Sequence, residues 1–392
     1  MKRVKPESFM LIAGEASGDL LAAELAAELR QAVPGAVCFG AGGGNMADAG
    51  VELIEEMSRF AVVGITDVLA KLLALRALMK KLVATAIQRQ PDVIIGVDYG
   101  GFNLRFAHAV KEYVRANPFS TWKPKIVQFV SPQVWASRPG RAHRLAEDHD
   151  LLLSIFPFEK NWYAQRVPQL RVEFVGHPMV GRFTNDDLRS AHHESGRVAA
   201  NHPPQILLLP GSRKSELKRH LPPMSGALEL IQQKLPEARA LMVLPNPTLR
   251  ELAAKLMGPG ARAELQTSGL PQALAQADLA IAKTGTVTME CAFFGVPAVT
   301  LYKGSWINYQ IARHLITVKT FTMPNLLANE EVYPEFLQNN LTAENLAGAA
   351  LDLLQNDARR QQIKSQLARI IASLGGPGAP KRAAAAILNL YK

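Results

Sequence analysis

The chain has 392 residues, of which 48% are hydrophobic, and its 44 lysines and arginines against 34 acidic residues give a net charge of +10. At roughly 150 residues per domain, this length predicts two or three domains that each bury a core, which argues against intrinsic disorder. The two cysteines, Cys38 and Cys291, are too few and too far apart for a disulfide framework or a CxxC zinc site. We therefore expect a reducing compartment and no structural metal.

The N-terminus carries Lys2, Arg3 and Lys5, but the apolar run at residues 9–13 is shorter than the roughly 7 residues of a signal-peptide core. No stretch approaches the roughly 18 uncharged apolar residues that a membrane-spanning helix needs. These features predict a cytoplasmic protein without a membrane span. A pI near 9.6 suits nucleic acid, an anionic membrane surface or phosphate-bearing small molecules as partners, and composition does not choose between them.

Short, continuously apolar segments alternate with helical patterns along the chain. Continuous rather than alternating hydrophobicity is typical of parallel strands that helices cover on both faces. The predicted strands occupy residues 9–14, 37–40, 93–98, 126–130, 151–156 and 172–176, and then 206–209, 240–244, 279–282 and 298–301. The sequence thus predicts an α/β protein with two parallel-sheet domains.

The alternation stops between residues 188 and 205, where histidines, prolines and small polar residues replace large apolar ones. We predict an N-terminal domain over residues 1–190, a linker over 191–205 and a C-terminal domain over 206–374. A glycine- and proline-rich breaker opens the last segment, 375–392, which we expect to form a helix that packs back on a domain or on a partner.

In such sheets ligands bind beyond the carboxyl ends of the strands, so the loops that follow the strands are the places to search. The turn GEASGD at residues 14–19 follows the first strand, and Ser17 or Asp19 could cap the next helix while its free N–H groups bind an anion. Taken alone, an ordinary capped turn explains it better. A second glycine-rich turn at 40–44 lacks the GxGxxG spacing, which argues against an NAD enzyme.

Asp98 follows the apolar strand segment 93–97 and precedes a permissive loop. A carboxylate in that position is desolvated on one side, which favours a general base, and a helix N-cap is an equally good interpretation. Ser131 and Trp135 follow the strand at 126–130 and are expected near the same rim. His177, after the last strand of this domain, is either a ligand contact or a turn residue.

Two loops of the second domain are typical of anion sites. The first contains Gly211, Ser212 and Arg213 after a strand, and it lacks the GK[ST] ending of a P-loop. The second runs through Thr284, Gly285 and Thr286 into a helix that carries Glu290, which could accept hydrogen bonds from ribose hydroxyls. Either loop alone is better explained as a capped helix start. Together they favour a nucleotide diphosphate.

Asp148, His149 and Asp150 match the DxD pattern by which some glycosyltransferases hold a divalent metal. They precede the predicted strand at 151–156 and so lie at the amino edge of the sheet, away from the ligand rim. We interpret them as a solvated turn.

A long helical pattern between residues 60 and 90 carries a wide apolar stripe, and lysines and an arginine flank it. Such a face suits acyl chains and anionic headgroups, although a core helix with a solvated basic side is the better explanation from the pattern alone. The stripe includes Ile65, Val68, Leu69, Leu72, Leu73 and Leu75.

Taken together, these motifs resemble those of the lipid-A-disaccharide synthase family. The resemblance rests on GEASGD at 14–19, SPQVWA at 131–136, FPFE at 156–159, GHP at 176–178, LPGSR at 209–213 and PNLL at 324–327, in that order along nearly the whole chain. Within it, Gly100 and Gly101 stand where the family more often has a proline and a second acidic residue.

The resemblance implies a GT-B glycosyltransferase with two Rossmann-like domains facing a cleft, without a metal or other cofactor. It implies transfer from UDP-2,3-diacylglucosamine to 2,3-diacylglucosamine 1-phosphate with inversion, by an enzyme peripheral to the cytoplasmic face of the inner membrane. Nucleic acid is not an expected partner, and a homodimer is left open.

The resemblance also implies roles for single residues. Asp98 would deprotonate the acceptor hydroxyl. Donor contacts would come from Gly211, Ser212, Arg213, Thr284, Gly285, Thr286, Glu290 and Asn325. Residues lining the acceptor side would be Gly14, Glu15, Ser17, Ser131 and His177.

Two other classes compete with this assignment. A UDP-sugar 2-epimerase or a soluble-acceptor transferase on the same fold would not need the wide apolar stripe. A basic nucleic-acid-binding protein predicts clustered cations and stacking aromatics, yet the chain has no run of five cations and only 7% aromatic residues.

Overall fold

The computed structural model describes residues 6–57, 68–183, 202–305, 318 and 320–392. The chain divides into two compact units, Met1–Val180 with Leu374–Lys392, and Gly181–Ser373. The first unit therefore ends at Val180 rather than at residue 190, and the segment from Leu374 onward belongs to it. Most of the predicted linker at 191–205 lies outside the described residues, and strand β8 begins at Gln205.

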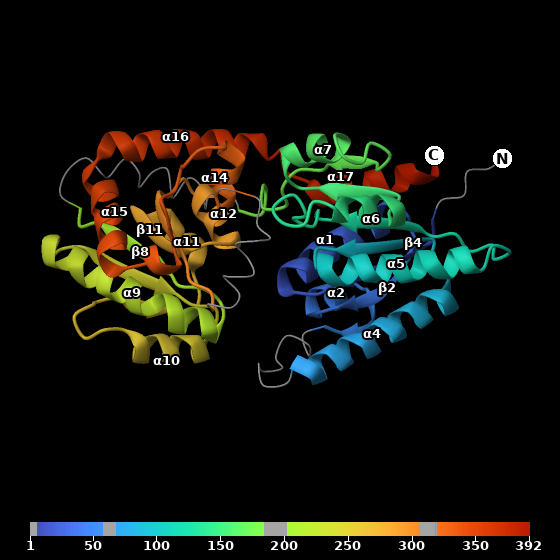
Figure 1. The fold of residues 1–392 in the computed structure, drawn as a ribbon, viewed down its shortest axis with the longest axis horizontal. Helices are drawn as coiled ribbons and strands as arrows, with labels where there is room; N and C mark the ends of the chain where they lie inside the picture. The colour runs from blue at the N-terminus through green and yellow to red at the C-terminus, as the bar shows by residue number, and fades with distance from the viewer. Residues whose placement is uncertain (1–5, 58–67, 184–201, 306–317, 319) are drawn as a thin grey trace. The chain divides into compact units, whose positions relative to one another are not determined.

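The first unit is a seven-stranded parallel sheet in the order β3-β2-β1-β4-β5-β6-β7 (Figure 1). Its strands are β1 (Ser8–Ala13), β2 (Val37–Gly42), β3 (Glu52–Glu56), β4 (Val93–Val97), β5 (Lys125–Phe129), β6 (Leu151–Ser154) and β7 (Val172–Phe174). Its helices are α1 (Ala16–Ala32), α2 (Gly44–Asp48), α4 (Val68–Arg89), α5 (Gly100–Ala116), α6 (Arg141–Asp148), α7 (Pro157–Ala164) and α17 (Ala379–Leu388), which the short turn η4 (Asn389–Tyr391) follows.

The second unit is a six-stranded parallel sheet in the order β10-β9-β8-β11-β12-β13. Its strands are β8 (Gln205–Leu209), β9 (Arg239–Val243), β10 (Glu264–Gln266), β11 (Leu279–Lys283), β12 (Ala298–Tyr302) and β13 (Glu335–Leu337). Its helices are α9 (Lys214–Lys234), α10 (Pro247–Leu256), α11 (Leu270–Gln276), α12 (Thr286–Phe293), α14 (Met323–Ala328), α15 (Ala343–Gln355) and α16 (Asp357–Ser373), with a 3₁₀ turn η3 (Gln338–Asn340).

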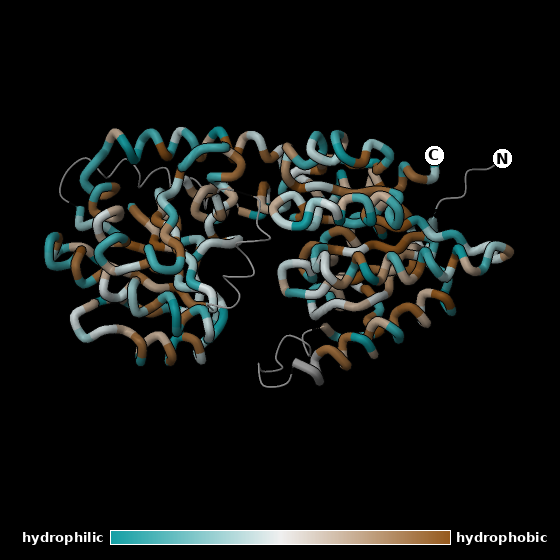
Figure 2. The backbone as a smooth tube through the Cα atoms, viewed as in Figure 1, coloured by the Kyte–Doolittle hydropathy of each residue, from teal (hydrophilic) through white to brown (hydrophobic). Residues whose placement is uncertain are grey.

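The central strands confirm the predicted fold class, because β1, β4, β8 and β11 are buried and apolar along their length except for one polar end residue in β1, β8 and β11. Figure 2 shows the same concentration of hydrophobic residues along the strands. Strands β3, β10 and β13 were not predicted. Each is a short outer strand whose sequence carries glutamate, so it lacks the continuous apolar run of a strand buried on both faces.

In both sheets the chain order reverses in the middle, where β1 pairs with β4 and β8 pairs with β11. Ligands of doubly wound sheets bind beyond the carboxyl ends of the strands at such a reversal. The loops after β1 and β4, and those after β8 and β11, are therefore the structural candidates for binding sites.

The segment after Leu374 completes the first unit. Helix α17 packs against α1, and the Arg382 side chain donates to the Val175 carbonyl at 2.8 Å. The Tyr391 hydroxyl donates to the Asp92 carbonyl at 2.8 Å, and the His177 N–H donates to the Leu374 carbonyl at 2.8 Å. The predicted final helix thus packs on the N-terminal unit.

Candidate active site

The turn after β4 holds two consecutive residues in the left-handed region, Asp98 at φ 50° and Tyr99 at φ 46°. Neither is glycine, so each conformation costs about 1 kcal/mol or more and persists only where neighbours enforce it. The turn redirects the chain from the buried end of β4 into α5, whose N-cap is Tyr99. Strain of this kind at a strand end is common at functional sites.

Two buried amides hold the strained turn in place. Asn103 Nδ2 and Gln128 Nε2 both donate to the Asp98 carbonyl, at 2.8 and 3.0 Å, and the Asp98 N–H donates to the Phe129 carbonyl at 2.8 Å. Both amide side chains are almost completely buried, so the bonds form away from competing water. The backbone of Asp98 is thereby fixed from β5 and from α5.

The predicted turn at residues 14–19 lies directly against this strand end. The Tyr99 ring covers Gly14 so closely that a Cβ there would come within 2.2 Å of the ring. A Cβ at Gly18 would lie 3.6 Å from Asp98 Cβ. The loops after β1 and β4 are therefore packed together at the reversal of chain order, with Glu15 and Ser17 exposed beside them.

The surroundings of Asp98 raise its pKa. Burial is the largest cause, the Tyr99 backbone N–H acts in the opposite direction, and the negative charge of Glu15 adds to the rise. A carboxylate with a raised pKa is a stronger proton acceptor, which suits a general base working near neutral pH.

The sequence had suggested that Ser17 or Asp19 caps the helix after β1. Neither side chain does so. Helix α1 begins at Ala16 with Glu15 as its N-cap and no capping side chain. The Asp19 carboxylate instead accepts hydrogen bonds from the backbone N–H groups of Gly43, Asn45 and Met46. It ties the second glycine-rich turn to α1.

Ser131 and His177 are buried and make internal bonds. Ser131 Oγ lies 2.9 Å from the Tyr163 hydroxyl, and His177 Nδ1 accepts from the Met179 N–H at 3.2 Å. Close by, the buried carboxyl of Glu159 accepts from Trp135 Nε1 at 2.9 Å. Burial raises the pKa of Glu159 to about 7, although its hydrogen bonds oppose the rise. The SPQVW and FPFE motifs thus pack onto each other.

In the second unit, the loop after β8 is built around a carboxylate. Gly211 adopts φ 125°, and any Cβ there would lie 2.4 Å from Glu216 Oε2. The Ser212 N–H donates to the same oxygen at 2.8 Å. Glycine is therefore required at this position both for its conformation and for the close approach of Glu216.

Glu216 also gathers cations from two loops. Lys283 Nζ, at the end of β11, lies 3.4 Å from Glu216 Oε1, and Arg213 Nη1 lies 3.9 Å from it. Burial would raise the pKa of Glu216, but Lys283, the Ser212 N–H and Arg213 together bring it below its ordinary value. The predicted anion loops after β8 and β11 are thus linked through one ionised carboxylate.

His220, on α9, fixes the same loop from behind. Its Nδ1 donates to the Pro210 carbonyl at 2.7 Å, and its Nε2 accepts from the Lys303 N–H at 3.1 Å. Because Nε2 must carry no proton to accept, the imidazole is neutral, and burial lowers its pKa accordingly. The histidine connects the loop after β8 with the loop after β12.

The loop after β11 begins α12 at Thr286, with Gly285 at φ 149° as the N-cap. Thr288 Oγ1 donates to the Gly285 carbonyl at 2.7 Å, Thr284 is buried and Thr286 is exposed. Glu290 lies one turn into the helix, where burial raises its pKa and Arg182 partly offsets the rise.

Asn325, on α14, uses its whole amide internally. Its Nδ2 donates to the Tyr333 carbonyl and to Glu335 Oε1, and its Oδ1 accepts from the N–H groups of Val332 and Tyr333. These bonds saturate the side chain. Asn325 therefore holds the segment between α14 and β13 in place, and its contact with the donor stays a prediction.

Comparison with known proteins decides the family. The family model described as lipid-A-disaccharide synthetase matches residues 9–389. The chain belongs to the lipid-A-disaccharide synthetase family. Lipid-A-disaccharide synthase from Nitrosococcus oceani is 37% identical over 374 residues, covering 93% of this chain and 92% of that protein. The synthase from Myxococcus xanthus is 33% identical over 386 residues, covering 98% of each.

Solved structures with the same fold are more distant in sequence. The Acinetobacter baumannii MurG structure has a TM-score of 0.59 at 17% identity, over 98% of this chain and 99% of that one. UDP-GlcNAc 2-epimerase from Neisseria meningitidis has a TM-score of 0.64 at 11% identity, over 97% and 100%. At these identities the likeness establishes the GT-B fold alone. The sequence relatives identify this family member as a UDP-sugar glycosyltransferase.

The predicted apolar stripe of this synthase family member divides along α4. Leu78 and Leu82 belong to the core of the first unit, and Leu75 is half-buried against it, whereas Leu72 and Leu73 are 42% and 55% exposed. Ile65 lies outside the described residues, as do the side chains of Val68 and Leu69. Among the described helices, none has both the length and the hydrophobicity to cross a bilayer.

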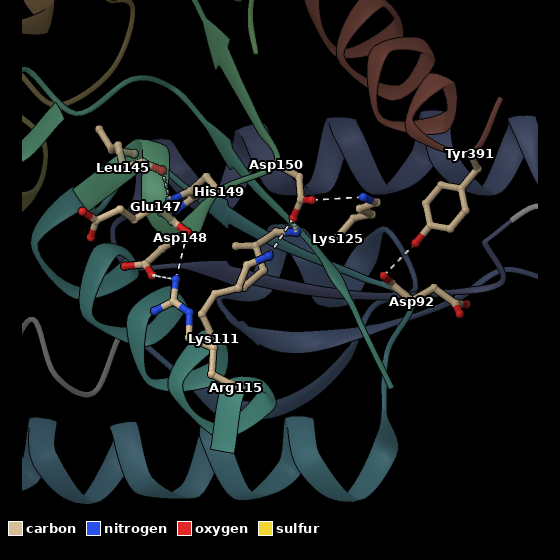
Figure 3. Close-up of polar contacts among 11 residues, drawn as sticks. Asp92, Lys111, Arg115, Lys125, Leu145, Glu147, Asp148, His149, Asp150 and Tyr391 are labelled. Carbon is tan, nitrogen blue, oxygen red and sulfur yellow. Dashed lines mark hydrogen bonds and ion pairs between the residues drawn. The ribbon is translucent and has the colours of Figure 1, made fainter. Parts of the chain in front are cut away.

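The interpretation of residues 148–150 as a solvated turn was wrong. They do lie at the amino edge of the first sheet, but Asp148 and His149 are buried. Figure 3 shows the polar contacts that these residues make with other elements. Asp148 accepts from His108 Nδ1 at 3.0 Å and lies 3.6 Å from Arg115, while Asp150 binds Lys111 and Lys125 at 3.0 and 3.1 Å. The polar sequence at 148–150 suggested exposure to solvent, whereas the partners that pair with these side chains lie on α5 and β5.

The described residues contain no cluster of three or more histidine, cysteine, aspartate or glutamate side chains placed to hold a metal ion. Sequence reasoning missed Asn103, Gln128, Glu216 and His220 as residues that shape the two sites. Gln128 gave a usable signal, because it is a polar residue in the middle of an apolar strand. His220 gave none, since its partner Lys303 lies 83 residues away, in the loop after β12.

Proposed function

We propose that this chain transfers a 2,3-diacylglucosamine residue from its UDP derivative to the 6-hydroxyl of 2,3-diacylglucosamine 1-phosphate. The products are UDP and the β-1,6-linked disaccharide 1-phosphate. The observation that carries the proposal is Asp98, which lies at the reversal of chain order in the first sheet with a raised pKa, in a chain of this family.

The chemistry assigned to Asp98 is proton removal. The carboxylate takes the proton of the acceptor hydroxyl, whose oxygen forms a bond to the sugar C1 as the bond from C1 to the UDP oxygen breaks. In-line displacement inverts the configuration at C1, and one carboxylate suffices because UDP is already a good leaving group. The clamp by Asn103 and Gln128 supports this role, since it fixes the base before substrate arrives.

The loops of the second unit are assigned to the donor. Arg213, Lys283 and the backbone N–H groups at the start of α12 bind the diphosphate and stabilise the charge that develops on UDP. One well-placed donor at such a charge is worth about 3 kcal/mol of barrier. Gly211, Ser212, Thr284 and Thr286 shape these loops, and Glu290 binds the ribose hydroxyls.

The exposed leucines of α4 are assigned to the acyl chains or the bilayer surface. Leu72 and Leu73 expose apolar surface at the start of a helix that also carries Arg76, Lys80 and Lys81. An apolar end flanked by cations favours contact with anionic lipid. We therefore propose a peripheral enzyme on the cytoplasmic face of the inner membrane.

Mass spectrometry of the products tests the proposal. Purified protein is incubated with both diacylated sugars, and the expected product is a tetra-acylated disaccharide monophosphate that forms together with UDP. Omitting the acceptor is the control. Release or epimerisation of the UDP-sugar without the acceptor would instead favour the 2-epimerase chemistry named for one structural neighbour. Absence of the disaccharide with both substrates present would overturn the proposal.

A further inference from the structure

Four arginines gather where α5 and α6 pack together in the first unit. Arg105 lies on α5, Arg138 precedes α6, and Arg141 and Arg144 lie one turn apart on α6. All four are exposed. Partial burial, followed by the positive charges of Arg138, Arg105 and Arg144, lowers the pKa of Arg141, so the other three guanidinium groups lie within electrostatic reach of Arg141. We call them the arginine cluster.

The arginine cluster has no matching negative charge among the described residues. Residues 131–146 contain no aspartate or glutamate, and no described carboxylate pairs with any of the four guanidinium groups. The far end of the same two helices differs, because there Asp148 pairs with His108 and lies 3.6 Å from Arg115. Arg115 therefore lies beside an acidic partner at the amino edge of the sheet, whereas the arginine cluster has no acidic partner among the described residues.

The arginine cluster lies on the same side of the sheet as Asp98. Helix α5 begins at Gly100, where a Cβ would come within 2.8 Å of Pro132, so the loops after β4 and β5 are in contact. Arg105 follows Gly100 by five residues, which is about 7.5 Å along a helix. Arg138, a non-glycine residue at φ 61°, lies in the strained turn that leads from the β5 loop into α6.

Exposed like charges that lie close together repel one another, and an anion bound among them relieves that repulsion. Guanidinium groups bind phosphate oxygens through paired N–H donors. We propose that the arginine cluster is a binding site for the phosphate of a lipid, either the 1-phosphate of the glycolipid acceptor or the phosphate of an anionic headgroup. The acceptor alternative deepens the proposed function and rests on it. The headgroup alternative does not.

The test removes two charges and measures both alternatives. In the variant Arg141→Gln/Arg144→Gln, we expect the acceptor KM in neutral detergent micelles to rise at least tenfold, with kcat within twofold, if the acceptor phosphate is the ligand. If the headgroup is the ligand, that KM stays unchanged. Binding to phosphatidylcholine vesicles that contain phosphatidylglycerol then falls at least tenfold, while binding to pure phosphatidylcholine does not change.

The matched control is Arg250→Gln/Arg369→Gln, which removes the same charge from exposed positions of the second unit. Arg105→Gln, on a different helix, must shift the same readout as the α6 variant. Unchanged KM and unchanged vesicle binding in the α6 variant overturn the inference, as does an equal effect of the control. If wild-type protein forms no disaccharide, the proposed function fails, and the vesicle measurement still decides the headgroup alternative.

Discussion

The two edges of the first sheet use charge in opposite ways. At the amino edge, Asp150 accepts the Ile126 N–H and binds two lysines, and these partners bring its pKa below the usual range against the effect of burial. At the carboxyl edge, Asp98 is desolvated beside the like charge of Glu15 on a strained turn, and its pKa is raised. A carboxylate whose charge is fully paired, such as Asp150, stabilises the fold. A buried carboxylate whose ionised form is disfavoured, such as Asp98, is available to accept a proton in catalysis.

Asp98→Asn should reduce turnover more than any other substitution considered below. The amide cannot accept the acceptor proton, so turnover should fall by about 10³-fold, within the range typical of lost general-base catalysis. UDP binding by calorimetry and the thermal midpoint should be unchanged. The matched variant at the other edge is Asp150→Asn, for which we expect near-normal kcat and a lower midpoint. Retained turnover in Asp98→Asn would exclude Asp98 as the base, and the two edges of the sheet would then not differ in catalytic role.

The pH dependence of stability should have opposite sign at the two edges. Burial lowers the pKa of His149 to about 4, so the unfolded chain binds an extra proton between about pH 6.5 and 4, and stability is lost as pH falls through that window. Glu159, at the carboxyl edge, has its pKa raised to about 7, so its contribution is present below about pH 4.5 and is lost as pH rises to 7. Each effect amounts to about 3 kcal/mol at most.

Urea unfolding at several pH values measures both slopes. When the pH falls from 6.5 to 4.5, His149→Asn should lose less unfolding free energy than the wild type, because the buried histidine no longer penalises acidification. Glu159→Gln should lose more unfolding free energy than the wild type over the same range. Comparing each variant with the wild type isolates one group, because the two slopes oppose each other in the parent chain. Parallel curves for wild type and His149→Asn would show that this histidine titrates normally in the folded state.

Gln128→Met should show how much the clamp on the Asp98 backbone contributes to turnover. The variant keeps the volume but removes the N–H donor from the strained Asp98 carbonyl, so we expect kcat to fall about tenfold, or about 1.4 kcal/mol, with little change in donor KM. A shifted pH profile of kcat distinguishes mispositioning of the base from general destabilisation. An unchanged profile together with unchanged kcat would mean that Asn103 holds the turn alone.

Leu72→Ser/Leu73→Ser should give the smallest effect. Both side chains are largely exposed, so the thermal midpoint should change little, while turnover of acylated substrate in vesicles should fall a few-fold. Leu78→Ser is the contrasting variant on the same helix, because Leu78 is buried in the core and its loss should lower the midpoint instead. Equal kinetics for wild type and the exposed double variant would remove the membrane role of α4.

The fold was predictable where one physical pattern dominated. Continuous apolar runs located the central strands, and glycine-rich turns after them located the loops around Gly14 and Gly211. The outer strand β3 was not predicted, because its residues, ELIEE, are charged and partly exposed. The site was predictable only as a set of loops, since the sequence cannot indicate that Glu216 turns back onto Ser212 or that His220 reaches Lys303. The prediction that Asp148 is solvated was wrong for the same reason, because its partners lie on α5.

The return of the chain to the first unit has a consequence for biosynthesis. Strands β1 to β7 are complete by Phe174, but the helix that packs against α1, and the tyrosine that binds the Asp92 carbonyl, lie beyond residue 378. The intervening Gly181–Ser373 unit must be translated before those contacts form. During synthesis the N-terminal sheet therefore lacks the helix that covers α1 until the end of the chain has been translated. The second unit can finish folding before the first.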